Sequence, residues 1–127
     1  MGDGDGVDAF QALINIVTLI ASPIEEQEFW LRSHDEPLDE IRIQFEDLST
    51  SLLPLYRESR LVDAADEIAI TELDEHLRHM AHTRLMYDWT LTKETGAWRR
   101  AQDLASELLV LLQRPPSEKR PIDTHPK

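Results

Sequence analysis

The chain has 127 residues, of which 41% are hydrophobic and 30% charged, and this balance predicts one globular domain. Cysteine is absent, which excludes a disulfide framework, a thiol nucleophile and a cysteine-ligated metal site, and fits a reducing compartment such as the cytoplasm. Lys and Arg number 13 against 25 Asp and Glu, a net charge of −12, so we expect a basic protein partner and no nucleic acid.

Residues 1–7 hold three of the four glycines, and we expect them to form a flexible leader outside the fold. A helix is predicted from about Asp8 to Ala21, because apolar residues cover well over half of its circumference. The longest apolar run, Ala12 to Ala21, contains polar residues and is shorter than the roughly 20 residues of a membrane span. We therefore expect a buried helix here and no membrane segment.

The residues from Ser22 to Glu25 predict the start of a second helix. A serine followed three residues later by glutamate is the pattern of a capping box, and Pro23 suits the first helical position. We expect this helix to extend to about Ser33, with glutamates in its first turns, where carboxylates stabilise the positive end of the helix dipole.

The segment from Asp35 to Tyr56 combines an apolar stripe with acidic flanks. Six of its apolar residues recur at steps of three and four, which predicts one face of a helix: Leu38, Ile41, Phe45, Leu48, Leu52 and Leu55. Apolar and polar residues also alternate over residues 40–46, so a short strand is the alternative there. Pro54 predicts a break near residues 49–51 and a second short helix after it.

Apolar residues from Leu61 to Met80 predict the next helical region, but their spacing slips between Ile68 and Leu73. We therefore expect a break near Ile70. Thr71 and Asp74 would then cap a helix that ends at about His82.

The last part of the chain contains two further helical patterns. A short helix is expected around Trp89, and a longer one over residues 97–113, ended by Pro115 and Pro116. The tail, residues 114–127, shows no periodicity and should be disordered. These elements together predict an all-α fold, a single-domain bundle of about six short helices over residues 8–113.

Three histidines, His76, His79 and His82, recur every three residues, and together with Glu72 this spacing suits two or three ligands of a metal site. However, the pattern lacks H-E-x-x-H, no second helix offers a matching pair, and such spacing is common on polar helix faces. We interpret these histidines as solvated and expect no metal or other cofactor. Motifs for a di-iron bundle, an activated nucleophile or a phosphate loop are also missing, so we expect no enzymatic activity; a metal-dependent helical enzyme is the alternative.

The acid excess is concentrated between Asp35 and Glu75, where 13 acids face three arginines. We call the following residues the acid belt: Asp35, Glu36, Asp39, Glu40, Glu46, Asp47, Asp63, Asp66, Glu67, Glu72, Asp74 and Glu75. The first nine of them are the predicted partner-binding residues, while an ordinary solvated surface is the alternative interpretation. Three tryptophans are candidate anchors at a partner surface, although we expect at least two to pack in the core: Trp30, Trp89 and Trp98.

In size, charge and layout the whole chain resembles the bacterial immunity proteins that neutralise polymorphic or contact-dependent toxins. Two stretches, EEQEFWLRSHDEPLDEIRIQFEDL and TGAWRRAQDLASELL, are typical of such proteins in style. The resemblance implies a tight one-to-one complex with a basic toxin domain, often a nuclease, in which carboxylates take the place of phosphates and occlude the active site. The alternative is a helical regulatory or interaction subunit, including a homodimer formed through apolar surface on the first and last helices.

Overall fold

The computed structural model describes residues 2–34, 39–83 and 95–119. The α-helices in these ranges are α1 (Gly2–Ala21), α2 (Ile24–His34), α3 (Asp39–Leu48), α4 (Leu53–Glu58), α5 (Ala64–Ala81) and α7 (Ala97–Leu112). The short 3-10 segments η1 (Thr50–Leu52) and η3 (Pro116–Glu118) accompany them. No strand occurs in these ranges, so the predicted all-α class is confirmed. Only five of the described helices have ten residues or more, since α4 has six. The prediction of about six short helices was therefore slightly off.

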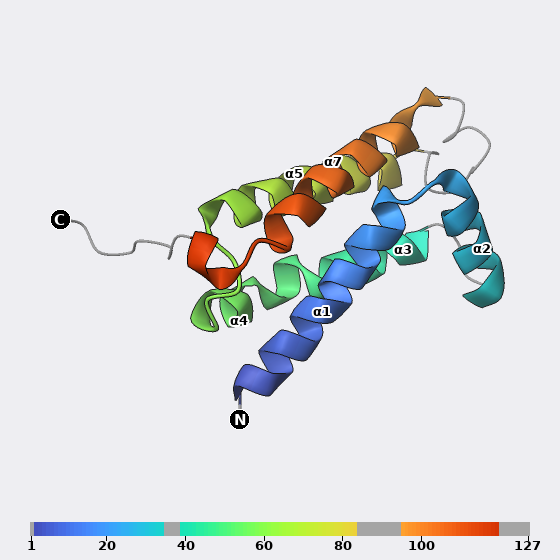
Figure 1. The fold of residues 1–127 in the computed structure, drawn as a ribbon. Helices are drawn as coiled ribbons and strands as arrows, with labels where there is room; N and C mark the ends of the chain where they lie inside the picture. The colour runs from blue at the N-terminus through green and yellow to red at the C-terminus, as the bar shows by residue number, and fades with distance from the viewer. Residues whose placement is uncertain (1, 35–38, 84–94, 120–127) are drawn as a thin grey trace.

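The core lies where α1, α3, α5 and α7 meet, since α1 packs against α7 and α3, and α7 packs against α5 (Figure 1). The largest fully buried side chains are Trp98 of α7, Tyr56 of α4 and Phe45 of α3. Phe10 of α1 meets the Tyr56 ring edge to face, with ring centroids 5.4 Å apart. In the described part of the chain, no helix is both long enough and apolar enough to cross a membrane.

The first helix begins at Gly2, so residues 2–7 belong to it and do not form the leader that the glycine content suggested. Gly6 is buried beside α4, and a Cβ atom at this position would lie 3.0 Å from the Ser59 hydroxyl oxygen. Glycine therefore fits the close approach of the two segments, where any side chain would press on Ser59, and its presence does not indicate disorder.

Residues 39–48 of the central stretch form the helix α3, which excludes the strand alternative for residues 40–46. Ile41 and Phe45 are buried one turn apart in α3, as the three-four spacing predicts. The expected break is also present: α3 ends at Leu48, and Pro54 lies in the first turn of α4, where its missing N–H leaves no hydrogen bond unmade.

Helix α5 runs through Thr71 without a break, so the predicted cap at Thr71 and Asp74 was wrong. The capping box lies eight residues earlier: the Asp66 amide donates to Asp63 Oδ1 at 3.0 Å, and the Asp63 amide donates to Asp66 Oδ2 at 2.9 Å. The apolar spacing misplaces the buried face of this helix, because Ile68 is exposed and an acid, Asp66, occupies a buried position.

Candidate partner-binding surface

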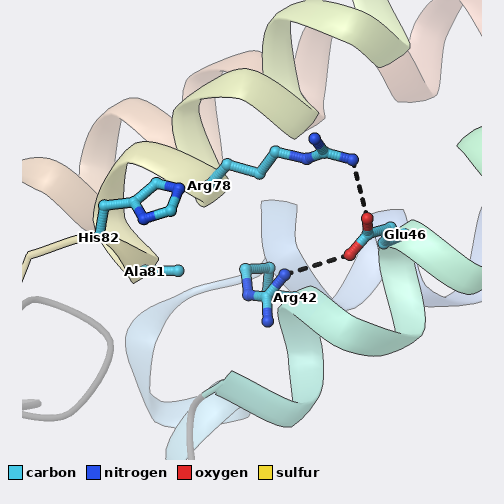
Figure 2. Close-up of a pocket in the computed structure, with 5 residues that line it drawn as sticks. All are labelled: Arg42, Glu46, Arg78, Ala81 and His82. Carbon is cyan, nitrogen blue, oxygen red and sulfur yellow. Dashed lines mark hydrogen bonds and ion pairs between the residues drawn. The ribbon is translucent and has the colours of Figure 1, made fainter.

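One acid of the belt, Glu46 of α3, pairs with two arginines: Arg42 on the same helix and Arg78 on α5, and the second pair joins the two helices (Figure 2). Arg42 Nη1 lies 3.1 Å from Glu46 Oε2, and Arg78 Nη2 lies 2.8 Å from Glu46 Oε1. Each guanidinium also pairs with a second acid: Asp39 lies 2.7 Å from Arg42 Nε, and Asp74 lies 2.9 Å from Arg78 Nε. We call these five residues the α3–α5 network.

An open pocket of about 420 Å³ lies beside this network, lined by Arg42, Glu46, Arg78, Ala81 and His82 (Figure 2). Two guanidinium groups would suit an oxyanion, but Glu46 already accepts from both of them. The three carboxylates and two guanidiniums of the network sum to a charge of −1, so they disfavour an added anion. The arrangement serves as a tie between two helices.

Asp74 is the buried end of the network. Loss of solvation on burial raises the pKa of its carboxyl group, and the neighbouring Arg78 opposes that rise. Its Oδ1 atom has no hydrogen-bond partner in the described residues. Asp74 therefore contributes to the joint between α3 and α5 and offers little surface to a partner.

Two other belt acids, Asp63 and Asp66, are buried and pair with Arg114 and Lys119, which are partly buried. We call these four residues the C-terminal cluster. Arg114 Nη2 lies 3.0 Å from Asp63 Oδ1 and 3.1 Å from Asp66 Oδ1, and Lys119 Nζ lies 3.5 Å from Asp66 Oδ2. Asp63 is 4% exposed and Asp66 0%. The structure thus removes both from the predicted contact set, because they serve the fold.

The C-terminal cluster shows that the folded region extends past residue 113, to residue 119. Residues 114–119 were expected to begin a disordered tail, yet Lys119 donates to the carbonyls of Leu61 at 2.7 Å and Leu112 at 3.1 Å. Burial lowers the pKa of Lys119 and raises that of Asp66, since both groups lose water. These residues close one end of the bundle, while residues 120–127 of the predicted tail lie outside the described ranges.

The remaining predicted contact residues differ in their availability. Glu67 pairs with Arg57, whose Nε donates to Glu67 Oε2 at 3.0 Å, and Glu40 accepts from Gln44 Nε2 at 3.4 Å. Asp47 is exposed, while Asp35 and Glu36 lie outside the described residues. Among the members of the predicted set that the structure describes, Asp47 is therefore the acid most open to a partner.

The surface stays acidic after internal pairing is taken into account. In the described ranges, ten exposed acids lie outside the ion pairs: Asp8, Glu25, Glu26, Asp47, Glu58, Glu72, Glu75, Asp103, Glu107 and Glu118. Only four exposed arginines in these ranges also lie outside the ion pairs: Arg32, Arg60, Arg99 and Arg100. The unneutralised acids are spread over most of the helices and are not confined to the acid belt.

Helix α2 is held in place by Gln27, which is fully buried. Its Nε2 atom lies within hydrogen-bond distance of the carbonyls of Leu19, Ile20 and Ser22, the last at 2.8 Å. These carbonyls belong to the end of α1, where backbone acceptors have no partner within the helix. The Ser22 hydroxyl, which was expected to cap the start of α2, instead donates to the Thr18 carbonyl of α1 at 2.6 Å.

The outward side of α2 carries an aromatic ring that the sequence analysis did not single out. Phe29 is 69% exposed, whereas the neighbouring Trp30 is partly buried and stacks on His34 with ring centroids 4.3 Å apart. Trp98 is fully buried in the core, and Trp89 lies outside the described residues. Among the aromatic residues described, Phe29 is therefore the one presented to solvent.

The three histidines do not gather into a site. The His76 Nε2 atom lies 2.8 Å from the Ala97 carbonyl, so this ring links α5 to the start of α7, while His79 and His82 are exposed. Nowhere in the described residues does a group of three or more His, Asp or Glu have a geometry suited to a metal ion. His76 thus has a structural contact of its own.

No protein-family model matches the chain, and neither a characterised protein nor a solved structure shows significant similarity to it. A functional proposal must therefore come from the surface described above.

Proposed function

We propose that the chain is a small acidic binding protein that neutralises a basic protein partner, as an immunity protein does when it blocks a toxin domain. One observation carries the proposal: ten exposed acids, against four exposed arginines, have no ion-pair partner in the described residues. A surface field of this sign attracts a positively charged protein and accelerates their encounter.

The fold supports this role by holding acids on rigid elements. The α3–α5 network and the C-terminal cluster fix neighbouring helices, so exposed carboxylates on those helices are ordered before a partner arrives. Preorganisation of this kind lowers the entropic penalty of association. If the partner is a nuclease, carboxylates in its active-site cleft would take the place of substrate phosphates and exclude nucleic acid.

A second candidate is a homodimer formed through α1 and α7. Val7 of α1 and Val110 of α7 are 53% and 70% exposed, which favours some apolar contact on these helices. Two valines provide far less than the roughly 800 Å² that each partner buries in a standard interface. The acidic surface is the more extensive feature, so the binding-protein proposal ranks first.

The proposal is tested by affinity capture of proteins from a lysate of the source organism with the tagged chain as bait. The bound proteins are washed at low and at high salt. We expect one basic protein in a one-to-one ratio at low salt and less of it at high salt, because screening weakens contacts between exposed charges. Expression of the recovered protein alone should arrest growth, and co-expression of this chain should restore it. Recovery of the chain by itself, with a native mass of a dimer, would instead support the homodimer.

A further inference from the structure

The outward side of α2 has a composition that differs from the rest of the acidic surface. Glu25, Glu26, Phe29 and Arg32 are all exposed, and their spacing of three and four residues places them on one side of the helix. We call these four residues the α2 face. An aromatic ring here is surrounded by charges, an arrangement that corresponds to an interface with an apolar centre and a polar rim.

We infer that the α2 face docks onto the basic partner, with the Phe29 ring entering an apolar pocket of that protein. The inference rests on the proposed function and names the surface and the anchor residue that it uses. An aromatic side chain can bury about 150–250 Å² when it is enclosed, so Phe29 offers the largest apolar gain among the exposed residues described.

Phe29 is held outward by the way α2 is attached. Gln27 is buried against the end of α1, and Ile24, Trp30 and Leu31 pack against the core, so the opposite side of the helix must face solvent. Gln102 of α7 donates to the Ser22 carbonyl at 2.7 Å and fixes the turn that precedes α2. The helix therefore presents Phe29 in one orientation, which favours binding without reorganisation.

The position of α2 leaves this face accessible. In Figure 1, α2 lies beside the end of α1, at the opposite end of the molecule from α4 and the C-terminal segment. Its main contact among the described elements is with α1. A partner can thus approach the α2 face without displacing any described element.

Charge decides which occupant fits. Glu25 and Glu26 lie within one turn of Phe29, and Arg32 is the one basic residue of the face. A second copy of the chain could place its Arg32 against Glu25 and Glu26 of the first, but each copy carries a net charge of −12, so two copies repel each other as a whole. A partner with an apolar pocket can enclose the Phe29 ring, and lysine or arginine side chains around that pocket can pair with Glu25 and Glu26.

The test measures the affinity of purified variants for the basic protein that the wild-type chain retains in affinity capture, at low and at high salt. We expect Phe29→Ala to weaken binding by about ten- to a hundredfold, the value of burying one large apolar side chain, at both salt concentrations. Glu25→Lys combined with Glu26→Lys should weaken binding mainly at low salt, because salt screens exposed charges. Val110→Ala is the matched control, since Val110 is as exposed as Phe29 but lies on α7, and it should leave the affinity within about twofold of wild type.

The outcomes separate the two proposals. If the partner binds wild type and Phe29→Ala equally well, the role of the α2 face is overturned while the binding function stands. An equal loss in Phe29→Ala and Val110→Ala would also overturn it, because the effect would not be specific to this face. If the wild-type chain retains no basic protein, both proposals fail. Circular dichroism and the melting temperature of Phe29→Ala should match wild type, because the ring is mostly exposed to solvent.

Discussion

Tyr56 is fully buried, and its hydroxyl donates a hydrogen bond to the Leu48 carbonyl, where α3 ends. Burial raises the pKa of Tyr56 to about 12 from an ordinary value of 10.0. Between these pH values the unfolded chain ionises its tyrosine while the folded chain retains the proton, so the folded state loses stability as the pH rises.

Stability at alkaline pH therefore depends on this residue. Between pH 10 and pH 12, the free energy of unfolding of wild type should fall by about 2 kcal/mol more than that of Tyr56→Phe, which has no ionisable group at this position. Urea unfolding at both pH values, followed by circular dichroism, measures the difference. Parallel pH profiles for the two proteins would contradict the burial of an un-ionised Tyr56.

A second prediction at the residue scale concerns Gly6. Replacing it with leucine places carbon atoms where Ser59 and Leu55 already lie, so we expect Gly6→Leu to destabilise the protein by about 1–3 kcal/mol. Val7→Leu is the control, since the neighbouring Val7 is exposed and should shift stability by less than about 0.5 kcal/mol. Equal melting temperatures for both variants would mean that residues 2–7 do not pack.

At the scale of elements, the C-terminal cluster connects the start of α5 to residues 114–119, which follow α7. Arg114 is held by Asp63 and Asp66, and its hydrogen bond to Asp63 contributes most to raising its pKa. Arg114→Met would leave two buried carboxylates without this partner, and we expect a loss of about 3 kcal/mol in the free energy of unfolding. Arg99→Met, at an exposed site outside the ion pairs, should have little effect. Chemical denaturation compares the two, and an equal effect would show that the cluster is not buried as described.

Helix positions set by local spacing could be predicted from the sequence, as α3 and the break before Pro54 illustrate. The extent of α5 could not, because Asp66 occupies a buried position in its stripe. That burial depends on Arg114 and Lys119, about 50 residues further along the chain, and no local pattern reveals such a contact. For the same reason, Asp63 and Asp66 were assigned to a partner.

For the candidate binding surface, the sequence predicted the excess of acidic residues but not the exposed Phe29. Phe29, Trp30 and Leu31 are consecutive apolar residues, and the sequence does not say which of them faces solvent. The orientation is decided by Gln27, whose contacts with the carbonyls at the end of α1 turn α2 on its axis. Nothing in the local sequence around Gln27 indicates that its side chain is buried, so the orientation of α2 could not be predicted.

For the whole molecule, the relevant property is the field of all exposed acids together. Reversing Glu72, Glu75, Asp103 and Glu107 to lysine changes the net charge from −12 to −4, because each substitution adds two charges. These acids are exposed and unpaired in the described residues, so the fold should be retained, while association with the basic partner should slow by about tenfold or more. The control, Arg99→Glu with Arg100→Glu, makes the chain more acidic and should accelerate association. Stopped-flow mixing measures both rates. An unchanged rate in the quadruple variant would show that the electrostatic field of the exposed acids does not accelerate association.

The most direct test of the acidic surface as a binding surface is the salt dependence of the affinity between the wild-type chain and the basic protein it retains. We expect the dissociation constant, measured by calorimetry over a series of salt concentrations, to rise steadily with salt, because the exposed carboxylates contribute through screened charge. A dissociation constant that stays the same across the series would contradict the account, and would assign the acids to the solubility of the protein instead.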